Sequence, residues 1–97
     1  MSAFKQFDQS AAEPIDTGFM LALRYRTPYI PLERVVQDFM THLKPEVAVR
    51  RANAGTLPFP AFKPDGVKSP FLVSVADLAA YLDAQRAAAA KDWQAGQ

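Results

Sequence analysis

Residues 30–55 read IPLERVVQDFMTHLKPEVAVRRANAG, and this stretch decides the fold. Pro31 suits the first position of a helix, where the missing N–H of proline costs no hydrogen bond. The apolar residues that follow recur at i, i+3, i+4, i+7 and i+8, as on one face of an amphipathic helix: Leu32, Val35, Val36, Phe39 and Met40. A second proline, Pro45, opens another helix that runs to Asn53 or Ala54, where Gly55 suits the C-terminal cap. Two helices joined by about four residues predict a helix-turn-helix.

The second helix has two possible inward faces. The favoured one carries Pro45, Ala48, Val49 and Ala52, which leaves the opposite side to Glu46, Val47, Arg50, Asn53 and Ala54. The other runs through Leu43, Val47 and Ala54, and we rank it second because it would bury Arg50.

Turn signals and two further helices flank this pair. Pro64-Asp65-Gly66 is a strong turn signal, and the short extended runs around it, residues 61–63 and 67–73, predict a β-hairpin that would form a wing. Ser74 with Asp77 resembles a capping box and begins a helix that continues to Trp93 and stops near Gly96. Residues 17–25 predict a short helix that ends before Pro28.

The expected fold is therefore mainly α with a small β-hairpin, a winged helix-turn-helix. We divide the chain into a flexible N-terminal arm (residues 1–16), the winged helix-turn-helix domain (17–86) and a C-terminal helical extension (87–97).

Composition excludes several classes of protein. With no cysteine, the chain has neither a disulfide scaffold nor a cysteine zinc site, which suits a cytoplasmic location. The single His42 cannot build a metal site alone, and it is expected to lie exposed in the turn between the two helices. The longest apolar run, residues 18–23, is too short to cross a membrane, and no signal peptide is recognisable. With no phosphate loop or nucleophile motif, we expect neither an enzyme nor a cofactor.

Charge is concentrated in the middle of the chain. The net charge is only +1, but residues 24–68 hold eight bases against four acids, a net of +4 between acidic ends of −2 and −1. Such clustering is a weak footprint of a polyanion-binding protein.

The second helix of the pair supplies residues that suit double-stranded DNA. Arg50 and Asn53 suit guanine and adenine, and Val47 suits a thymine methyl group. Lys44 and Arg51 suit the phosphate backbone. Lys63 and Lys68 flank the predicted wing turn and would hold DNA there; alternatively, they are only the solvated tip of a hairpin.

The last helix offers a seam for a homodimer. From Leu78, residues Leu82, Gln85, Ala89 and Trp93 follow at spacings close to a heptad. The alternative is an alanine-rich tail whose Trp93 folds back on the core of its own chain.

Several motifs together resemble one family. They are Phe19–Ala22 (FMLA), Ile30–Glu33 (IPLE), Leu57–Pro60 (LPFP), Lys68–Pro70 (KSP) and Asp77–Arg86 (DLAAYLDAQR), with Trp93 downstream. This set is similar to the pyocin activator protein PrtN family of phage- and bacteriocin-linked transcriptional activators, and residues 55–60 and 77–82 also resemble MerR-like excisionases. The resemblance implies sequence-specific DNA binding upstream of target genes, and it extends over residues 18–93.

Two other functions stay open at this point. An excisionase-like factor would use the same fold to bend DNA for a recombinase. A phage adaptor or antiterminator would act through protein contacts, with RNA polymerase as a candidate partner, and its motivation is the modest charge together with Phe4, Phe7 and Trp93. A shallow salt dependence of DNA binding would favour the adaptor.

Overall fold

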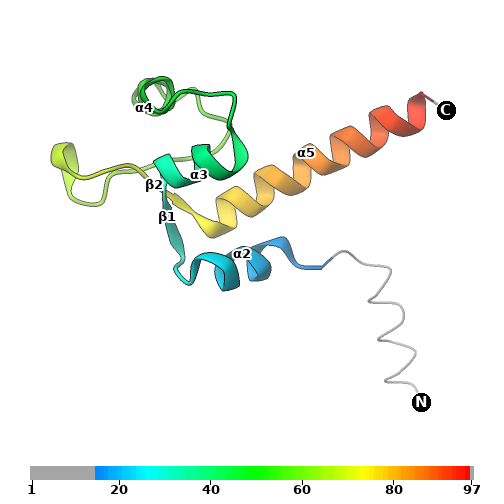
Figure 1. Cartoon of the computed structure of the whole chain (residues 1–97), viewed down its shortest axis with the longest axis horizontal. Helices are drawn as coiled ribbons and strands as arrows, with labels where there is room; N and C mark the ends of the chain where they lie inside the picture. Colours follow the sequence, from blue (N-terminus) through cyan, green and yellow to red (C-terminus); the bar gives the residue numbers. More distant parts are fainter. Residues whose placement is uncertain (1–14, 97) are drawn as a thin grey trace, which may run out of the picture.

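The computed structural model describes residues 15–96, and its elements follow one another as helices with two short strands between them (Figure 1). They are α2 (Thr17–Tyr25), β1 (Tyr29–Pro31), α3 (Leu32–Phe39), α4 (Pro45–Ala54), the 3-10 helix η1 (Gly66–Lys68), β2 (Leu72–Ser74) and α5 (Val75–Ala95). This confirms a mainly α fold with a small antiparallel β element. The predicted arm, residues 1–16, lies outside the described residues except for Ile15 and Asp16.

Local capping chemistry sets the ends of the helices. The Asp16 carboxylate accepts hydrogen bonds from the backbone N–H groups of Gly18 (3.0 Å) and Phe19 (3.3 Å) and begins α2. Ser74 begins α5 in the same way, as predicted, by accepting from Ala76 and Asp77. Such caps supply partners for N–H groups that the first turn of a helix leaves unpaired.

The strand pairing differs from the predicted hairpin. β2 pairs antiparallel with β1, which lies far upstream in the chain, so that Ile30 stands opposite Val73. The expected first arm, residues 61–63, contributes only a single bridge in which Phe62 and Leu72 exchange two backbone hydrogen bonds (3.0 and 2.7 Å). Val67 and Lys68 lie in η1 instead of a strand. The physical reason is burial: Ile30 and Val73 are both fully buried, whereas the prolines of residues 60–70 cannot donate to a ladder.

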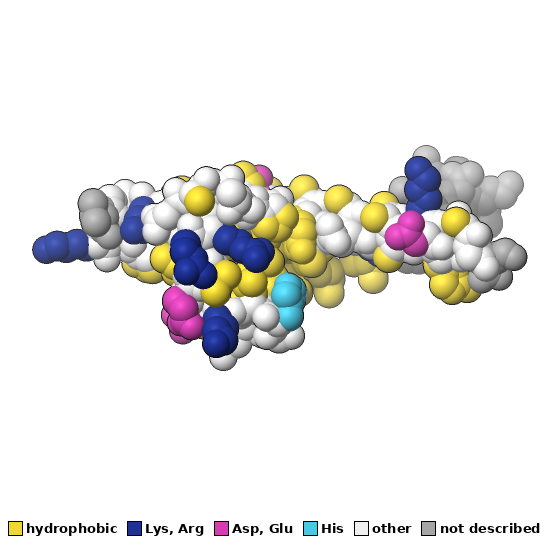
Figure 2. Space-filling view, turned by 90° about the horizontal axis from the view of Figure 1, so that it is seen from above, with side chains coloured by type: hydrophobic (Ala, Val, Ile, Leu, Met, Phe, Trp, Pro, Cys, Tyr) yellow, Lys and Arg dark blue, Asp and Glu magenta, His cyan; other side chains and the backbone are white. Residues whose placement is uncertain are grey.

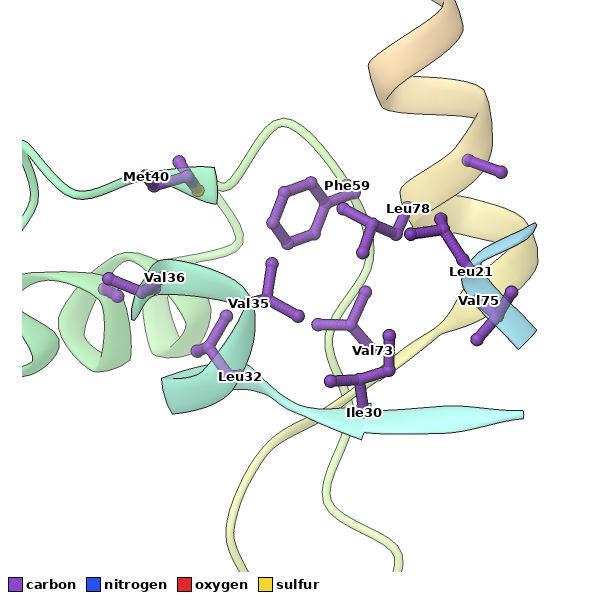
Figure 3. Packing of buried hydrophobic residues seen from close by; sticks show 12 residues of the cluster. Leu21, Ile30, Leu32, Val35, Val36, Met40, Phe59, Val73, Val75 and Leu78 are labelled. Carbon is purple, nitrogen blue, oxygen red and sulfur yellow. The ribbon is translucent and has the colours of Figure 1, made fainter. Parts of the chain in front are cut away.

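One hydrophobic core holds the helices and the two strands together (Figure 3). It takes Leu32, Val35 and Val36 from the predicted stripe of α3, with Met40 just beyond the helix. The remaining buried members come from α2, α4 and α5, from both strands and from the loop before η1: Leu21, Ile30, Ala48, Phe59, Val73, Val75, Leu78 and Ala79. Figure 3 shows Phe59 over the first turns of α5, between α5 and α3. The core thus packs the helix-turn-helix against β2 and α5.

α2 runs antiparallel to the first half of α5. The Thr17 hydroxyl donates to Asp83 at one end (2.5 Å), and the Val75 N–H donates to the Pro28 carbonyl near the other (2.8 Å). Beyond Asp83, α5 continues without a break away from the body of the molecule (Figures 1 and 2). Residues 83–96 are all exposed, and Trp93 does not fold back on the core.

Candidate nucleic-acid interface

The second helix of the helix-turn-helix, α4, lies on the outside of the molecule, and both of its ends have residues typical of helix termini. Pro45 occupies its first turn together with Glu46, and Gly55 ends it in the left-handed conformation (φ 71°). Leu43 donates its N–H to the Met40 carbonyl in the turn from α3 (2.9 Å), and His42 is exposed there, as expected. Packing of Ala48 into the core fixes which side of α4 faces outward.

The outward arc of α4 confirms the predicted placement of Arg50 and Asn53 and corrects that of Val47. Arg50 and Asn53 are exposed on the side opposite the buried Ala48 and the half-buried Ala52. Val47 is half-buried, whereas Val49 is 43% exposed. The apolar residue available to a ligand is therefore Val49, which the sequence analysis placed inside.

The prediction failed here because two arcs of α4 carry similar residues. The inward direction depends on how α3 crosses α4, and the local sequence does not specify that crossing. The second-ranked face through Leu43 and Val47 is in fact partly buried, without burying Arg50.

The loop between Phe62 and Leu72 forms the wing in place of a hairpin tip. Its turn is held by Ser69, whose hydroxyl accepts from the Asp65 N–H (3.1 Å) and donates to the Gly66 carbonyl (3.2 Å). Lys68 is exposed at the end of η1. Lys63 is half-buried, with its Nζ 4.8 Å from the centre of the Phe71 ring. Of the two predicted wing cations, Lys68 is thus the more accessible.

The face that carries α4 gathers positive charge. Figure 2 looks onto this face and shows Lys and Arg side chains over α4, with the single histidine beside them. Lys44, Arg50 and Arg51 are exposed here against one acid, Glu46. Within residues 15–96 both ion pairs involve Asp38 on α3, so none of these three cations is neutralised by one.

A shallow groove connects α4 to the wing. It has a volume of about 190 Å³ and lies between the start of α3, Val49 and the wing. Lys63 and Phe71 line its wing side, and Glu33 lines its α3 side. The exposed basic helix α4 and the wing therefore lie next to each other.

Comparison with protein families shows the family of the chain. The sequence model of the pyocin activator protein PrtN family matches residues 17–89, most of the 97 residues of the chain. The chain belongs to the pyocin activator protein PrtN family. The match begins with α2 and includes α3, α4, the wing and most of α5. The positively charged face that carries α4 therefore lies entirely within the residues that match the family.

Membership in the PrtN family supports a role as a transcriptional activator of pyocin genes. The family is a regulatory family and not a family of enzymes. Comparison with curated proteins and comparison with solved structures each gave no significant match. Residue-level roles in this PrtN-family chain therefore rest on its own geometry.

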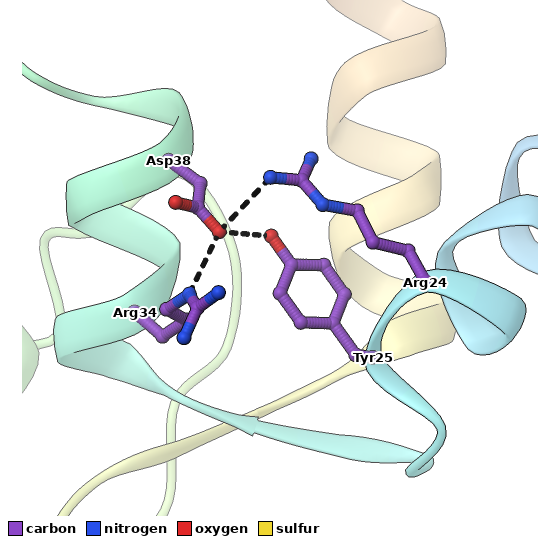
Figure 4. A network of polar contacts seen from close by, with 4 residues as sticks. All are labelled: Arg24, Tyr25, Arg34 and Asp38. Carbon is purple, nitrogen blue, oxygen red and sulfur yellow. Dashed lines mark hydrogen bonds and ion pairs between the residues drawn. The ribbon is translucent and has the colours of Figure 1, made fainter.

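A polar network that the sequence analysis missed links α2 to α3 (Figure 4). One oxygen of Asp38, Oδ2, accepts from the Tyr25 hydroxyl and from Arg34 Nε (3.1 Å), and it forms an ion pair with Arg24 Nη2 (3.3 Å). The Arg24 guanidinium also lies 5.0 Å from the centre of the Tyr25 ring. Only the i, i+4 spacing of Arg34 and Asp38 was visible in the sequence.

This network shifts the pKa values of Asp38 and Tyr25, and it changes where unneutralised positive charge lies on the surface. The hydrogen bond from Tyr25, aided by Arg34 and Arg24, holds the pKa of Asp38 below its usual value. Burial and the same hydrogen bond raise the pKa of Tyr25 to about 12. Because Arg24 and Arg34 share Asp38, they are partly neutralised, and the free positive charge of residues 24–68 shifts toward α4.

Residues 15–96 contain no cluster of three or more metal-ligating side chains. None of the helices described there is long and apolar enough to span a membrane.

Proposed function

We propose that this PrtN-family chain activates transcription by binding promoter DNA as a homodimer, with α4 in the major groove and the wing on the neighbouring backbone. The observation that carries this proposal is the outward arc of α4, where Arg50 and Asn53 stand exposed with no ion pair. These are the residue types that read guanine and adenine, and helix dimensions fit the major groove.

The residues around this arc have a consistent division of roles. Lys44 and Arg51 flank it and would contact phosphates, and Lys68 would do so from the wing. Val49 replaces Val47 as the residue that would contact a thymine methyl group. Glu46 lies in the first turn of α4, where a carboxylate favours the helix N-terminus.

A promoter-binding experiment tests the proposal. The wild type and the double variant Arg50→Ala/Arg51→Ala are titrated against a duplex from upstream of the pyocin-type genes that the protein regulates. The charge-matched control removes Arg26 and Lys91, which are exposed and lie outside α4 and the wing. We expect the α4 variant to lose at least tenfold in affinity and the control to lose less. Undiminished binding by the α4 variant would rule out this helix as the reading element.

A further inference from the structure

We propose that the outer face of α2 and the overhang of α5 form the interface between two copies of this chain, each overhang covering the α2 helix of the partner. The outer face of α2 consists of Phe19, Met20 and Leu23, and the overhang consists of residues 84–95. This proposal specifies the contacts of the homodimer proposed above and rests on it.

The α2 helix is apolar on both sides. Its inner side packs Leu21, 6% exposed, into the core. Its outer side presents Phe19 (60% exposed), Met20 (48%) and Leu23 (55%), which neighbour one another at i, i+3 and i, i+4. A contiguous cluster of exposed apolar side chains on one face of a helix marks an interaction surface. The outer side therefore needs an occupant.

The overhang of α5 repeats the face with which α5 already holds its own α2. Ala79 and Asp83 form that contact: a side-chain carbon at Gly18 would lie 3.7 Å from the Ala79 Cβ, and Thr17 donates to Asp83. At helical spacing the same face continues through Arg86, Ala87, Ala90 and Trp93, which are all exposed. Small alanine side chains on this face allow close approach of the bulky residues of a second α2.

The geometry is self-complementary. α2 covers the first half of α5, with Thr17 beside Asp83, and the overhang extends in the other direction. At 1.5 Å per residue the overhang is about 18 Å long and α2 about 14 Å, so one overhang spans one α2. A two-fold axis near Asp83 would align the two α5 helices antiparallel with both α2 helices between them. Every α2 would then be covered by its own α5 and by the overhang of the partner, in an isologous interface.

The apolar area matches what a stable dimer needs. Phe19, Met20 and Leu23, with Ile15 (74% exposed) and Trp93 (68%), offer on the order of 500 Å² of apolar surface. A standard interface buries roughly 800 Å² per partner, of which about 60% is apolar. In a dimer of two identical copies, each copy contributes this apolar surface to the interface.

Disulfide trapping tests the arrangement, because the natural chain contains no cysteine. Within one copy, Leu23 and Ala90 lie on opposite sides of the Thr17–Asp83 contact, about 20 Å apart along the helices. In the proposed pair, Leu23 of one copy faces Ala90 of the other. Full-length Leu23→Cys/Ala90→Cys should therefore give a covalent dimer under mild oxidation. The control is Leu23→Cys/Ala88→Cys, since Ala88 lies on the far side of α5. Equal trapping in both, or trapping only in the control, would overturn the proposal.

Sedimentation of glutamate variants separates this interface from other dimers. Ala90→Glu should dissociate the dimer, Ala88→Glu should leave it intact, and helix content should be the same in both. If Ala89→Glu dissociates the dimer and Ala90→Glu does not, the overhangs pair along the Leu82–Trp93 seam and the proposal is wrong. A monomeric wild type would overturn it as well. DNA binding by the wild type, measured separately, reports on the proposed function independently of the interface.

Discussion

The Tyr25 hydroxyl donates a hydrogen bond to Asp38 Oδ2 and thereby joins the last turn of α2 to the last turn of α3. The same carboxylate oxygen also holds Arg34 and Arg24. Because α2 packs on α5 and α3 packs on α4, this contact connects the proposed dimer interface to the proposed DNA-binding surface.

Tyr25 should make stability sensitive to alkaline pH. Folding raises the pKa of Tyr25 from 10.0 to about 12, so the folded state retains a proton that the unfolded state loses. Its contribution is fully present below pH 10 and is lost as the pH rises from 10 to 12. We expect the free energy of unfolding of the wild type to fall across this window relative to Tyr25→Phe. Denaturant titrations at pH 8, 10, 11 and 12 measure the difference. Tyr29→Phe, a change at an exposed tyrosine, is the control, and parallel curves for wild type and Tyr25→Phe would contradict the assignment.

Two glycines should respond oppositely to alanine. Gly55 ends α4 at φ 71° with open space around it, so Gly55→Ala should cost about 1 kcal/mol through backbone strain alone. Gly18 lies within α2, where an added carbon would make ordinary contacts of 3.5 and 3.7 Å. Gly18→Ala should therefore stabilise the fold by up to about 1 kcal/mol. Chemical denaturation checks both, and effects of the same sign would show that the conformation of one position is misassigned.

The helices could be predicted from the sequence because their signals are local. Pro45, Gly55 and Ser74 each act on neighbouring backbone groups, so α4 and the start of α5 follow from nearby residues, whereas the Asp16 cap of α2 was not foreseen. β1 was missed because its partner strand is far away in the chain, and three residues carry no period.

The candidate site was predicted less completely, for a related reason. Arg50 and Asn53 lie outward as expected, because the favoured inward face of α4, which includes Ala48, left them on the opposite side of the helix. Identifying Val49, and not Val47, as the exposed valine requires knowing how Ala48 packs against the core, and this packing is a tertiary property. The sharing of Asp38 by residues of two helices likewise depends on how α2 meets α3.

Val49 should discriminate thymine from uracil if α4 reads the major groove. Replacing the contacted thymine by deoxyuridine removes only a methyl group, worth about 0.8 kcal/mol or about fourfold in affinity. The wild type should show this loss at one position of its binding site, and Val49→Ala should not. Val47→Ala, which alters the half-buried neighbour, should retain the thymine preference. Retention of the preference in Val49→Ala would assign the methyl contact elsewhere.

Lys68 should contribute affinity without sequence preference. A wing lysine on a phosphate releases one counterion, so Lys68→Ala should weaken binding to all duplexes and reduce the slope of log affinity against log salt by about 1. Lys91→Ala, an exposed lysine on α5, is the control and should leave the slope unchanged. Equal slopes for Lys68→Ala and wild type would leave the wing lysine without a role in DNA binding.

Selection of duplexes from a random-sequence pool tests the central claim, that α4 reads DNA, most directly. The wild type should enrich one sequence motif, and Arg50→Ala should lose preference at one G·C pair, with a cost of about 1–3 kcal/mol there. Non-specific affinity should change far less. Enrichment of the same motif with the same affinity by Arg50→Ala would contradict the claim.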